Sequence, residues 1–413
     1  MIPRLGLLAA IGLLCGSAWA APTVQRAVPV AENSAPISFY VAKGQPGACG
    51  PGCDSWIAAE GRIDNAALAR FRKFLRQLGG RQLPIYFHSP GGNLEQALAI
   101  GAMLRERKAV ARVARTVVRE CGFEAQDSDV CVKLKQSGRE LHGEFWTRGA
   151  SCNSACPYLI LGAVTREIAP DTSLAVHSPK VMLSFTGGTP TREVRAQALQ
   201  RAMERSDSMV LDYIRRMGAD PGLLTVAHSV KFENMHVLTR EEIAAFGIDR
   251  RAQIETPWVF ENASRGVVYK TAVRRNDGEA SFRTTQLRLL CIEADRFELG
   301  FQRAAPASPG FISVAALMGT ERLRFSYPPR KVAGQELWGV LVSGKQVRAA
   351  EADADVELTE GELISGRWQF QSTKFSNEGL PGALESLRAT CPQGKSVVSP
   401  VVTPVASRNS AAK

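Results

Sequence analysis

Apolar and polar residues alternate with two different periods over residues 38–254, which predicts helices and strands that take turns along the chain. From Ala66 to Leu78 apolar residues recur every three or four positions, a spacing typical of an amphipathic helix. The same spacing returns from Leu94 to Arg105 and, over a longer stretch, from Arg192 to Met217. Short apolar runs lie between these helices, at residues 55–59, 84–87, 110–118 and 173–176. This alternation predicts an α/β domain with a parallel-sheet core and right-handed crossovers.

The pattern changes from about Pro257. Short, often alternating apolar runs now follow one another, separated by Gly, Pro and Asp turns, at residues 267–271, 287–291, 297–301, 323–327 and 337–341. We therefore expect a second, β-rich domain over residues 255–393, in the form of a sandwich, with a late helix from Gly382 to Thr390. No catalytic group of residues stands out there, so an accessory role in interaction or positioning is the default expectation.

The two ends differ from the domains between them. Arg4, the apolar run Leu5–Leu14 and the small residues Ala18 and Ala20 of a small-x-small cleavage site predict a signal peptide over residues 1–20 and export to the periplasm. A lipoprotein signal at Cys15 is disfavoured because the bulky Leu14 precedes it. Residues 21–37 predict a flexible lead-in and residues 394–413 a disordered tail. No later stretch is long enough for a membrane span, so the mature chain is expected to lack an integral membrane segment.

Nine cysteines change the picture further. Cys15 belongs to the predicted signal peptide, and the eight that remain favour disulfides in an exported protein. Sequence alone leaves the connectivity open, but closeness along the chain favours Cys49–Cys53, Cys121–Cys131 and Cys152–Cys156, with Cys291 and Cys391 left to each other. Zinc is the competing interpretation, yet the spacings lack a CxxC knuckle. No metal is expected.

The chain carries a formal net charge of +11, with a sequence pI near 9.4. The basic residues are scattered among acidic ones, without a long run and without interleaved aromatic residues. This favours a solvated basic surface and no nucleic-acid partner. Since no phosphate-binding loop is present either, no cofactor is expected.

Three motifs carry candidate chemistry. A predicted strand runs into His88–Gly92, which ends in Gly-Gly, and the segment Ser151–Cys156 places small residues before a predicted helix. A third strand ends at His177, which Ser178 and Pro179 follow. A serine nucleophile needs a base to take its proton, and backbone N–H groups near a Gly-Gly turn or a helix start can hold an oxyanion. The three motifs together predict a serine hydrolase site.

The order of these motifs resembles the Clp protease (ClpP)/crotonase fold, and the nearest likeness is to ClpP-like periplasmic proteins. The resemblance spans roughly residues 38–252, and the segments Gly61–Asp64 and Leu238–Asp249 fit the same fold. It implies Ser154 as the nucleophile and His177 as its base. It also implies a polypeptide substrate and a homo-oligomer, which a projecting helix at Arg192–Met217 would help to assemble.

The resemblance further implies that the N–H groups of Gly92 and Ala155 form the oxyanion hole, although Gly-Gly can also be a plain tight turn. Ser154 has the alternative of a simple helix cap, with Ser151 the nearest wrong choice. His88 is the second candidate for the base.

The third triad position departs from the family. Where the family has aspartate, this chain has Asn234, which can orient an imidazole but cannot stabilise imidazolium by charge. Glu233 is the third triad residue if the correspondence between this chain and the family is shifted by one residue. If neither residue fills that position, the site is a Ser-His dyad.

An insertion from Cys121 to Trp146 is a second departure from the family. It is either a disulfide-tied flap beside Ser154 or a surface loop, and we favour the flap slightly. These departures support an alternative in which the chain is a non-catalytic binding or assembly protein of the same fold. Crotonase chemistry on acyl-CoA is disfavoured by the export signal and by the Ser/His pair.

Overall fold

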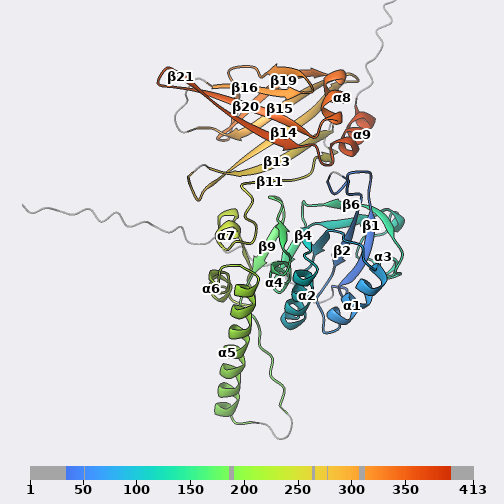
Figure 1. Cartoon of the computed structure of the whole chain (residues 1–413), viewed down its shortest axis with the longest axis vertical. Coiled ribbons are helices and arrows are strands. Elements are labelled where there is room, and N and C mark those ends of the chain that lie inside the picture. Colours follow the sequence, from blue (N-terminus) through green and yellow to red (C-terminus); the bar gives the residue numbers. More distant parts are fainter. Residues whose placement is uncertain are drawn as a thin grey trace, which may run out of the picture.

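The computed structural model describes residues 34–50, 52–185, 190–262, 266–276, 278–306 and 312–391. These form an N-terminal α/β part and a C-terminal part made mainly of strands (Figure 1). The predicted signal peptide, the lead-in up to residue 33 and the tail 394–413 lie outside the described residues.

The N-terminal part is built on a seven-stranded sheet with the order β5-β6-β1-β2-β3-β4-β8. Strands β2, β3, β4 and β8 run parallel, as the sequence predicts, whereas β1 is antiparallel to β2 and β5 is antiparallel to β6. The strands are β1 (Ser38–Lys43), β2 (Ser55–Glu60), β3 (Ile85–His88), β4 (Val110–Val113), β5 (Arg115–Val118), β6 (Leu141–Trp146) and β8 (Thr165–Glu167).

Helices α1 (Ala67–Leu78), α2 (Leu94–Glu106) and α4 (Cys156–Leu161) cover the sheet with the apolar faces that their sequences predict. Helix α1 buries Phe71 and Leu78, and every residue of α4 is buried. Helices α2 and α4 approach closely at Gly101, where an added Cβ would lie 3.0 Å from the carbonyl oxygen of Leu159. A single apolar core therefore fixes α4 against the sheet.

A smaller three-stranded sheet, with the order β10-β9-β7, stands beside the main one and carries two of the three motifs. It contains β7 (Ser151–Asn153), β9 (Ser173–Val176) and β10 (His236–Val237), and a bridge between Ser89 and Cys152 joins it to the end of β3. Helices α5 (Arg192–Arg216), α6 (Gly222–His228) and α7 (Arg240–Ala245) follow, and α5 projects from the molecule as an arm (Figure 1).

The insertion Cys121–Trp146 is part of the main sheet rather than a flap over Ser154. It follows the short helix η1 (Arg119–Cys121) and forms α3 (Asp129–Lys135) and β6, which pairs with both β1 and β5. Lys135 lies 2.8 Å from the carboxylate of Glu60, and Phe145 packs on Trp56 with ring centroids 5.5 Å apart. Both the flap and the surface-loop hypotheses were wrong, because α3 and β6 hold the polar insertion in the fold through these contacts.

The C-terminal part is β-rich, as predicted, and all of its strand pairs are antiparallel. One sheet has the order β11-β13-β14-β15-β19-β18 with β12 added beside β13, and the other has the order β17-β16-β20-β21. One apolar core contains residues of both sheets, including Leu287, Phe301, Leu358 and Phe375, and the sandwich itself stays a prediction. The elements are β11 (Gln253–Glu255), β12 (Val259–Glu261), β13 (Val267–Arg275), β14 (Phe282–Glu293), β15 (Arg296–Ala304), β16 (Ile312–Met318), β17 (Glu321–Arg324), β18 (Arg330–Val332), β19 (Gln335–Ser343), α8 (Gly344–Ala352), β20 (Asp355–Ile364), β21 (Arg367–Ser376) and α9 (Leu380–Thr390).

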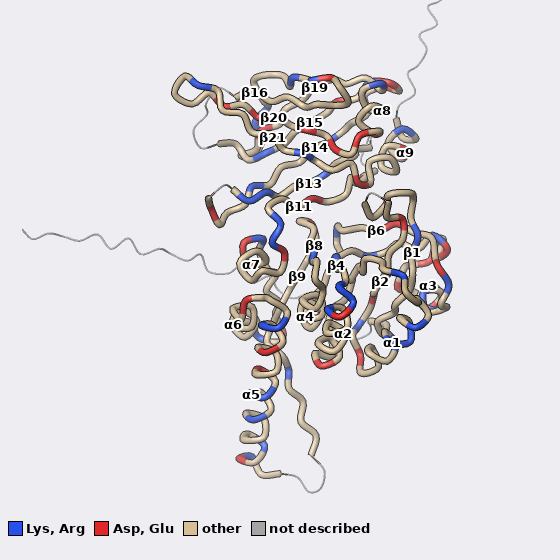
Figure 2. The backbone as a smooth tube through the Cα atoms, viewed as in Figure 1, with Lys and Arg blue, Asp and Glu red and all other residues tan. Residues whose placement is uncertain are grey.

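The four disulfides are those that the sequence favours: Cys49–Cys53, Cys121–Cys131, Cys152–Cys156 and Cys291–Cys391. Figure 2 shows basic and acidic residues interspersed over both parts of the molecule, in agreement with the expected mixed surface.

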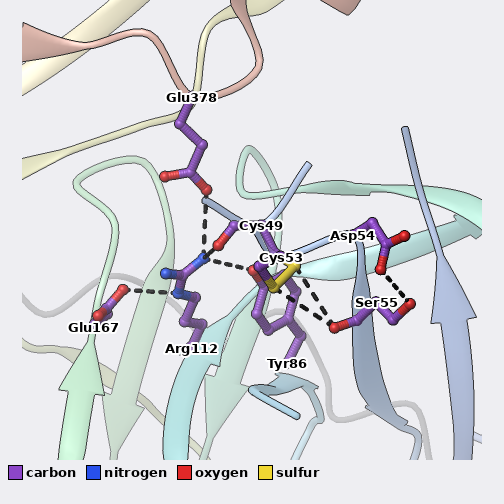
Figure 3. Close-up of a disulfide and its surroundings, with 8 residues drawn as sticks. All are labelled: Cys49, Cys53, Asp54, Ser55, Tyr86, Arg112, Glu167 and Glu378. Carbon is purple, nitrogen blue, oxygen red and sulfur yellow. Dashed lines mark hydrogen bonds and ion pairs between the residues drawn. A yellow bond between two sulfur atoms is a disulfide. The ribbon is translucent and has the colours of Figure 1, made fainter. Parts of the chain in front are cut away.

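Arg112 links the two parts beside the first disulfide (Figure 3). Its Nη1 donates to the carbonyl oxygen of Cys49 at 3.0 Å and to the hydroxyl of Tyr86 at 2.6 Å, and it lies 3.4 Å from Glu378 of the C-terminal part. Its Nε lies 2.7 Å from Glu167. The guanidinium is thus held by four groups, one of which belongs to the other part of the chain.

Candidate active site

Ser154 and His177 each follow the carboxyl end of a strand, β7 and β9, and these two strands are neighbours in the small sheet. The Nε2 atom of His177 lies 2.7 Å from the Oγ atom of Ser154, and the imidazole is only 6 % exposed. Ser154 lies in the turn between β7 and α4 with a φ of 59°, a left-handed conformation that is uncommon for a residue other than glycine. Its N–H donates to the carbonyl oxygen of Ala175 at 2.8 Å, which fixes the turn on β9.

Local sequence explains why the turn forms. Cys152 pairs with Leu174 in the parallel β7–β9 ladder, and its disulfide to Cys156 closes a short loop around Ser154. Both cysteines are fully buried. Pro157, in the first turn of α4, suits a helix start because proline has no N–H to leave unpaired there.

Gly91 and Gly92 bring the end of β3 against this turn. A Cβ on Gly91 would lie 2.5 Å from the Cβ of Ser154 and 2.9 Å from the backbone nitrogen of Ala155, so only glycine fits there. The N–H of Gly91 donates to the Oγ of Ser89 at 3.1 Å. Within the described ranges, the N–H groups of Gly92 and Ala155 have no acceptor, which leaves two backbone donors beside the serine.

The other nitrogen of His177 is in a different situation. Its Nδ1 is buried and has no hydrogen-bond partner among the residues that the structure describes. Burial lowers the pKa of His177 below its usual value, while the backbone of Phe232 and the charge of Glu233 act in the opposite direction. A lowered pKa keeps the imidazole neutral at neutral pH, which is the form that accepts a proton.

The structure brings Ser154 and His177 together but places no third side chain in hydrogen-bond contact with the imidazole. Asn234 is half-buried in a turn, where its N–H donates to the carbonyl oxygen of Lys231 at 2.9 Å, and Glu233 is exposed. Neither side chain forms a hydrogen bond with Nδ1. A Ser-His pair is therefore the constellation present, and the role of Asn234 stays a prediction.

The remaining four histidines all have other partners. His88 accepts the N–H of Ser151 through Nδ1 at 3.1 Å, and burial lowers its pKa. The other three lie within 3.2 Å of a carboxylate, in the pairs His142–Glu120, His228–Asp207 and His236–Glu242. His88 thus holds the start of β7, and His177 is the histidine that forms a hydrogen bond with Ser154.

Phe232 is a site residue that the sequence analysis missed. Its ring centroid lies 4.9 Å from that of His177, and the Nζ of Lys180 lies 5.4 Å from the Phe232 ring. The signal available in the sequence was its position next to Glu233 and Asn234. Over the described part of the chain, no group of His, Cys, Asp and Glu residues could hold a metal ion, and no helix is both long and apolar enough to cross a membrane.

This arrangement has the parts needed for acyl transfer. A serine hydroxyl is hydrogen-bonded to a neutral imidazole, and two N–H donors lie on the neighbouring backbone.

Comparison with known proteins gives a fold likeness at low similarity. No family model matches the chain, and no curated protein matches it. Among solved structures, the 1510-N membrane-bound stomatin-specific protease is 17% identical over 46% of this chain and 75% of its own, with a TM-score of 0.28. ClpP1 from Listeria monocytogenes is 16% identical over 46% of this chain and 85% of its own, with a TM-score of 0.27.

Invasion associated protein B from Bartonella henselae is 14% identical over 32% of this chain and 92% of its own, with a TM-score of 0.26. ClpP1 is thus among the structures found. At these TM-scores the likeness does not bear on activity, which depends on the geometry described above.

Proposed function

We propose that this protein is an exported serine peptidase in which Ser154 and His177 act as a catalytic pair. The observation that carries the proposal is the 2.7 Å contact between Oγ of Ser154 and Nε2 of His177, next to the free N–H groups of Gly92 and Ala155. Four disulfides support an oxidising compartment such as the periplasm.

In this mechanism Oγ of Ser154 attacks a peptide carbonyl carbon while Nε2 of His177 takes the hydroxyl proton. The N–H groups of Gly92 and Ala155 donate to the oxygen that becomes negative. His177 then returns the proton to the leaving amine, and water releases the acyl group from Ser154 by the same steps. Asn234 or Glu233 would complete the site only after a side-chain movement toward Nδ1.

A fluorophosphonate probe on the purified protein tests the proposal. We expect labelling of the wild type, no labelling of Ser154→Ala, and labelling slowed on the order of 10²-fold or more in His177→Ala. Ser151→Ala is the matched control, because this serine lies three residues before Ser154, at the start of strand β7, and should not affect labelling. The proposal would be contradicted if the Ser154→Ala variant were still labelled, or if the folded wild type were not labelled.

A second candidate function is a non-catalytic binding or assembly protein. It is favoured by the unpartnered Nδ1 of His177, because a base without an orienting acceptor is a weaker catalyst. This alternative predicts no turnover of casein or peptide libraries and a partner that Ser154→Ala still retains. Turnover that depends on Ser154 would reject it.

A further inference from the structure

The outer face of the larger C-terminal sheet carries a groove that the catalytic pair does not use. Leu287, Leu289 and Cys291 of β14 are buried in the core, so Gln286 and Arg288, which alternate with them, point to the opposite face. A cavity of about 640 Å³ lies on this face. It is lined by Thr271, Thr284, Gln286, Arg288, Gln302 and Gln335, among others.

The open space beside Arg288 lies on the side of Gln286. Arg288 is paired with Gly300 of β15, and Gly300 is paired in turn with Gly339 of β19. The carboxylate of Glu298 covers Gly339, because a Cβ added there would lie 2.7 Å from its Oε1, and neither glycine lines the cavity. A ligand therefore reaches Arg288 from the cavity, over Gln286 and Gln302.

The chemistry of the lining favours an anion. The side chain of Gln286 accepts from Nε of Arg288 through Oε1 and donates to Oγ1 of Thr271 at 3.1 Å, which orients the guanidinium. Arg288 forms no ion pair with a carboxylate of the described chain, and no acidic residue lines the cavity. By contrast, Arg283 at the edge of the cavity lies 3.8 Å from Glu360.

We infer that this groove binds an acidic peptide segment, with a side-chain carboxylate on Arg288 and the peptide backbone on the glutamines. A guanidinium presents two parallel N–H donors that match the two oxygens of a carboxylate. Glutamine amides donate and accept at once, as peptide groups do, and Oε1 of Gln302 is buried without a hydrogen-bond partner in the described chain. Charge complementarity and amide pairing thus select the same kind of ligand.

The position of the groove connects it with the serine. Tyr269 is paired with Arg288 on β13, and its hydroxyl accepts from Nη1 of Arg148 at 3.2 Å. Arg148 also lies 2.9 Å from Glu261, and its loop leads directly into β7 and Ser154. A role in holding substrate rests on the proposed function, but peptide binding itself does not require Ser154.

Binding is measured on the full-length Ser154→Ala protein, so that no cleavage interferes. The probe is a fluorescein-labelled peptide of alternating Glu and Ser, compared with the same peptide carrying Gln for Glu, by fluorescence anisotropy. We expect the Glu peptide to bind about tenfold or more tightly than the Gln peptide, and added salt to weaken it.

Arg288→Gln in this background should lower the affinity about tenfold. Arg322→Gln is the matched control, because Arg322 is an exposed arginine of β17 on the other sheet, and it should leave affinity unchanged. Equal affinity of the two variants would overturn the inference, as would equal binding of the Glu and Gln peptides.

Tighter binding of oligogalacturonate than of the Glu peptide would overturn the assignment to peptide. Binding of the Glu peptide by a protein that the fluorophosphonate probe does not label would refute the proposed peptidase activity but would support the proposed peptide-binding groove.

Discussion

The ring of Phe232 lies 4.9 Å from the imidazole of His177, tilted by 41°. Ser178, the next residue after His177, donates its N–H to the carbonyl oxygen of Val230 at 2.9 Å, so backbone and ring are held by the same loop. The backbone of Phe232 raises the pKa of this imidazole, and no described side chain accepts from its Nδ1. The orientation of the imidazole therefore depends on packing and on the backbone of Phe232, at the position where a Ser-His-Asp triad has a carboxylate.

Replacing Phe232 should impair the base without unfolding the protein. We expect Phe232→Ala to lower kcat about tenfold or more with a smaller change in KM, and Phe232→Tyr to retain most of the rate. Phe123→Ala is the control, because Phe123 is the most exposed phenylalanine among those described. Steady-state kinetics and thermal melting measure the two effects, and an unchanged kcat in Phe232→Ala would contradict the packing argument.

The pH profile should report the buried imidazole. Because burial lowers the pKa of His177, and only the neutral ring accepts a proton, activity should fall on acidification with a midpoint below about 6.5. The charge of Glu233 raises this pKa, so Glu233→Gln should move the midpoint further to lower pH. Glu124→Gln, a change at an exposed glutamate of the insertion, should not. A midpoint that moves upward in Glu233→Gln would contradict this account.

Gly91 should be far more sensitive to substitution than a glycine with open space around it. Gly91→Ala places a Cβ 2.5 Å from that of Ser154 at a φ of 98°, so the nucleophile turn must shift. We expect probe labelling to fall about 10²–10³-fold, the cost typical of a damaged oxyanion hole. At Gly80 an added Cβ meets nothing within 4 Å, and Gly80→Ala should label normally. Normal labelling of Gly91→Ala would argue against this geometry.

Two disulfides of equal spacing allow a controlled test of redox sensitivity. Cys152–Cys156 and Cys49–Cys53 both join residues four apart, but only the first encloses Ser154. Replacing Cys152 and Cys156 by alanine should abolish most turnover at a stability cost of no more than about 2–4 kcal/mol. The double alanine variant of Cys49 and Cys53 should keep its activity. Equal activity losses in both variants would indicate a purely structural role for each bond.

Glu378 should make the stability of the protein depend on pH. Burial raises its pKa, with Arg112 and Lys270 acting in the opposite direction. A carboxyl group with a raised pKa in the folded state contributes stability at low pH that is lost as the pH rises through that pKa. Glu378→Gln removes this pH-dependent loss of stability, and Arg112 still has its ion pair with Glu167. The variant should therefore melt about 2–4 °C higher than the wild type at about pH 8 and no higher at about pH 4. A melting difference that shrinks with rising pH would contradict it.

Much of the N-terminal part was accessible from the sequence because its signals are local. Helices α1, α2 and α5 follow from apolar periodicity, and Ser154 and His177 from motifs at strand ends. The place of β6 in the sheet could not be predicted from the sequence, because it depends on contacts between distant residues. Strand β6 pairs with β1 at Ala42 and Leu141, and Lys135 is buried against Glu60. Stacking of Phe232 on His177 likewise depends on a loop whose path only the folded chain defines.

The position of β6 has a consequence for folding order. Strand β1 pairs with its sequence neighbour β2 on one side but has to wait for β6 on the other, and β5 also closes the sheet only through β6. An unpaired strand edge can pair with other chains while a protein is being synthesised. Any fragment that ends before residue 141 leaves the β1 edge open. The insertion thus makes completion of the sheet a late, long-range event, and we expect nascent or truncated chains to need protection from aggregation until it has happened.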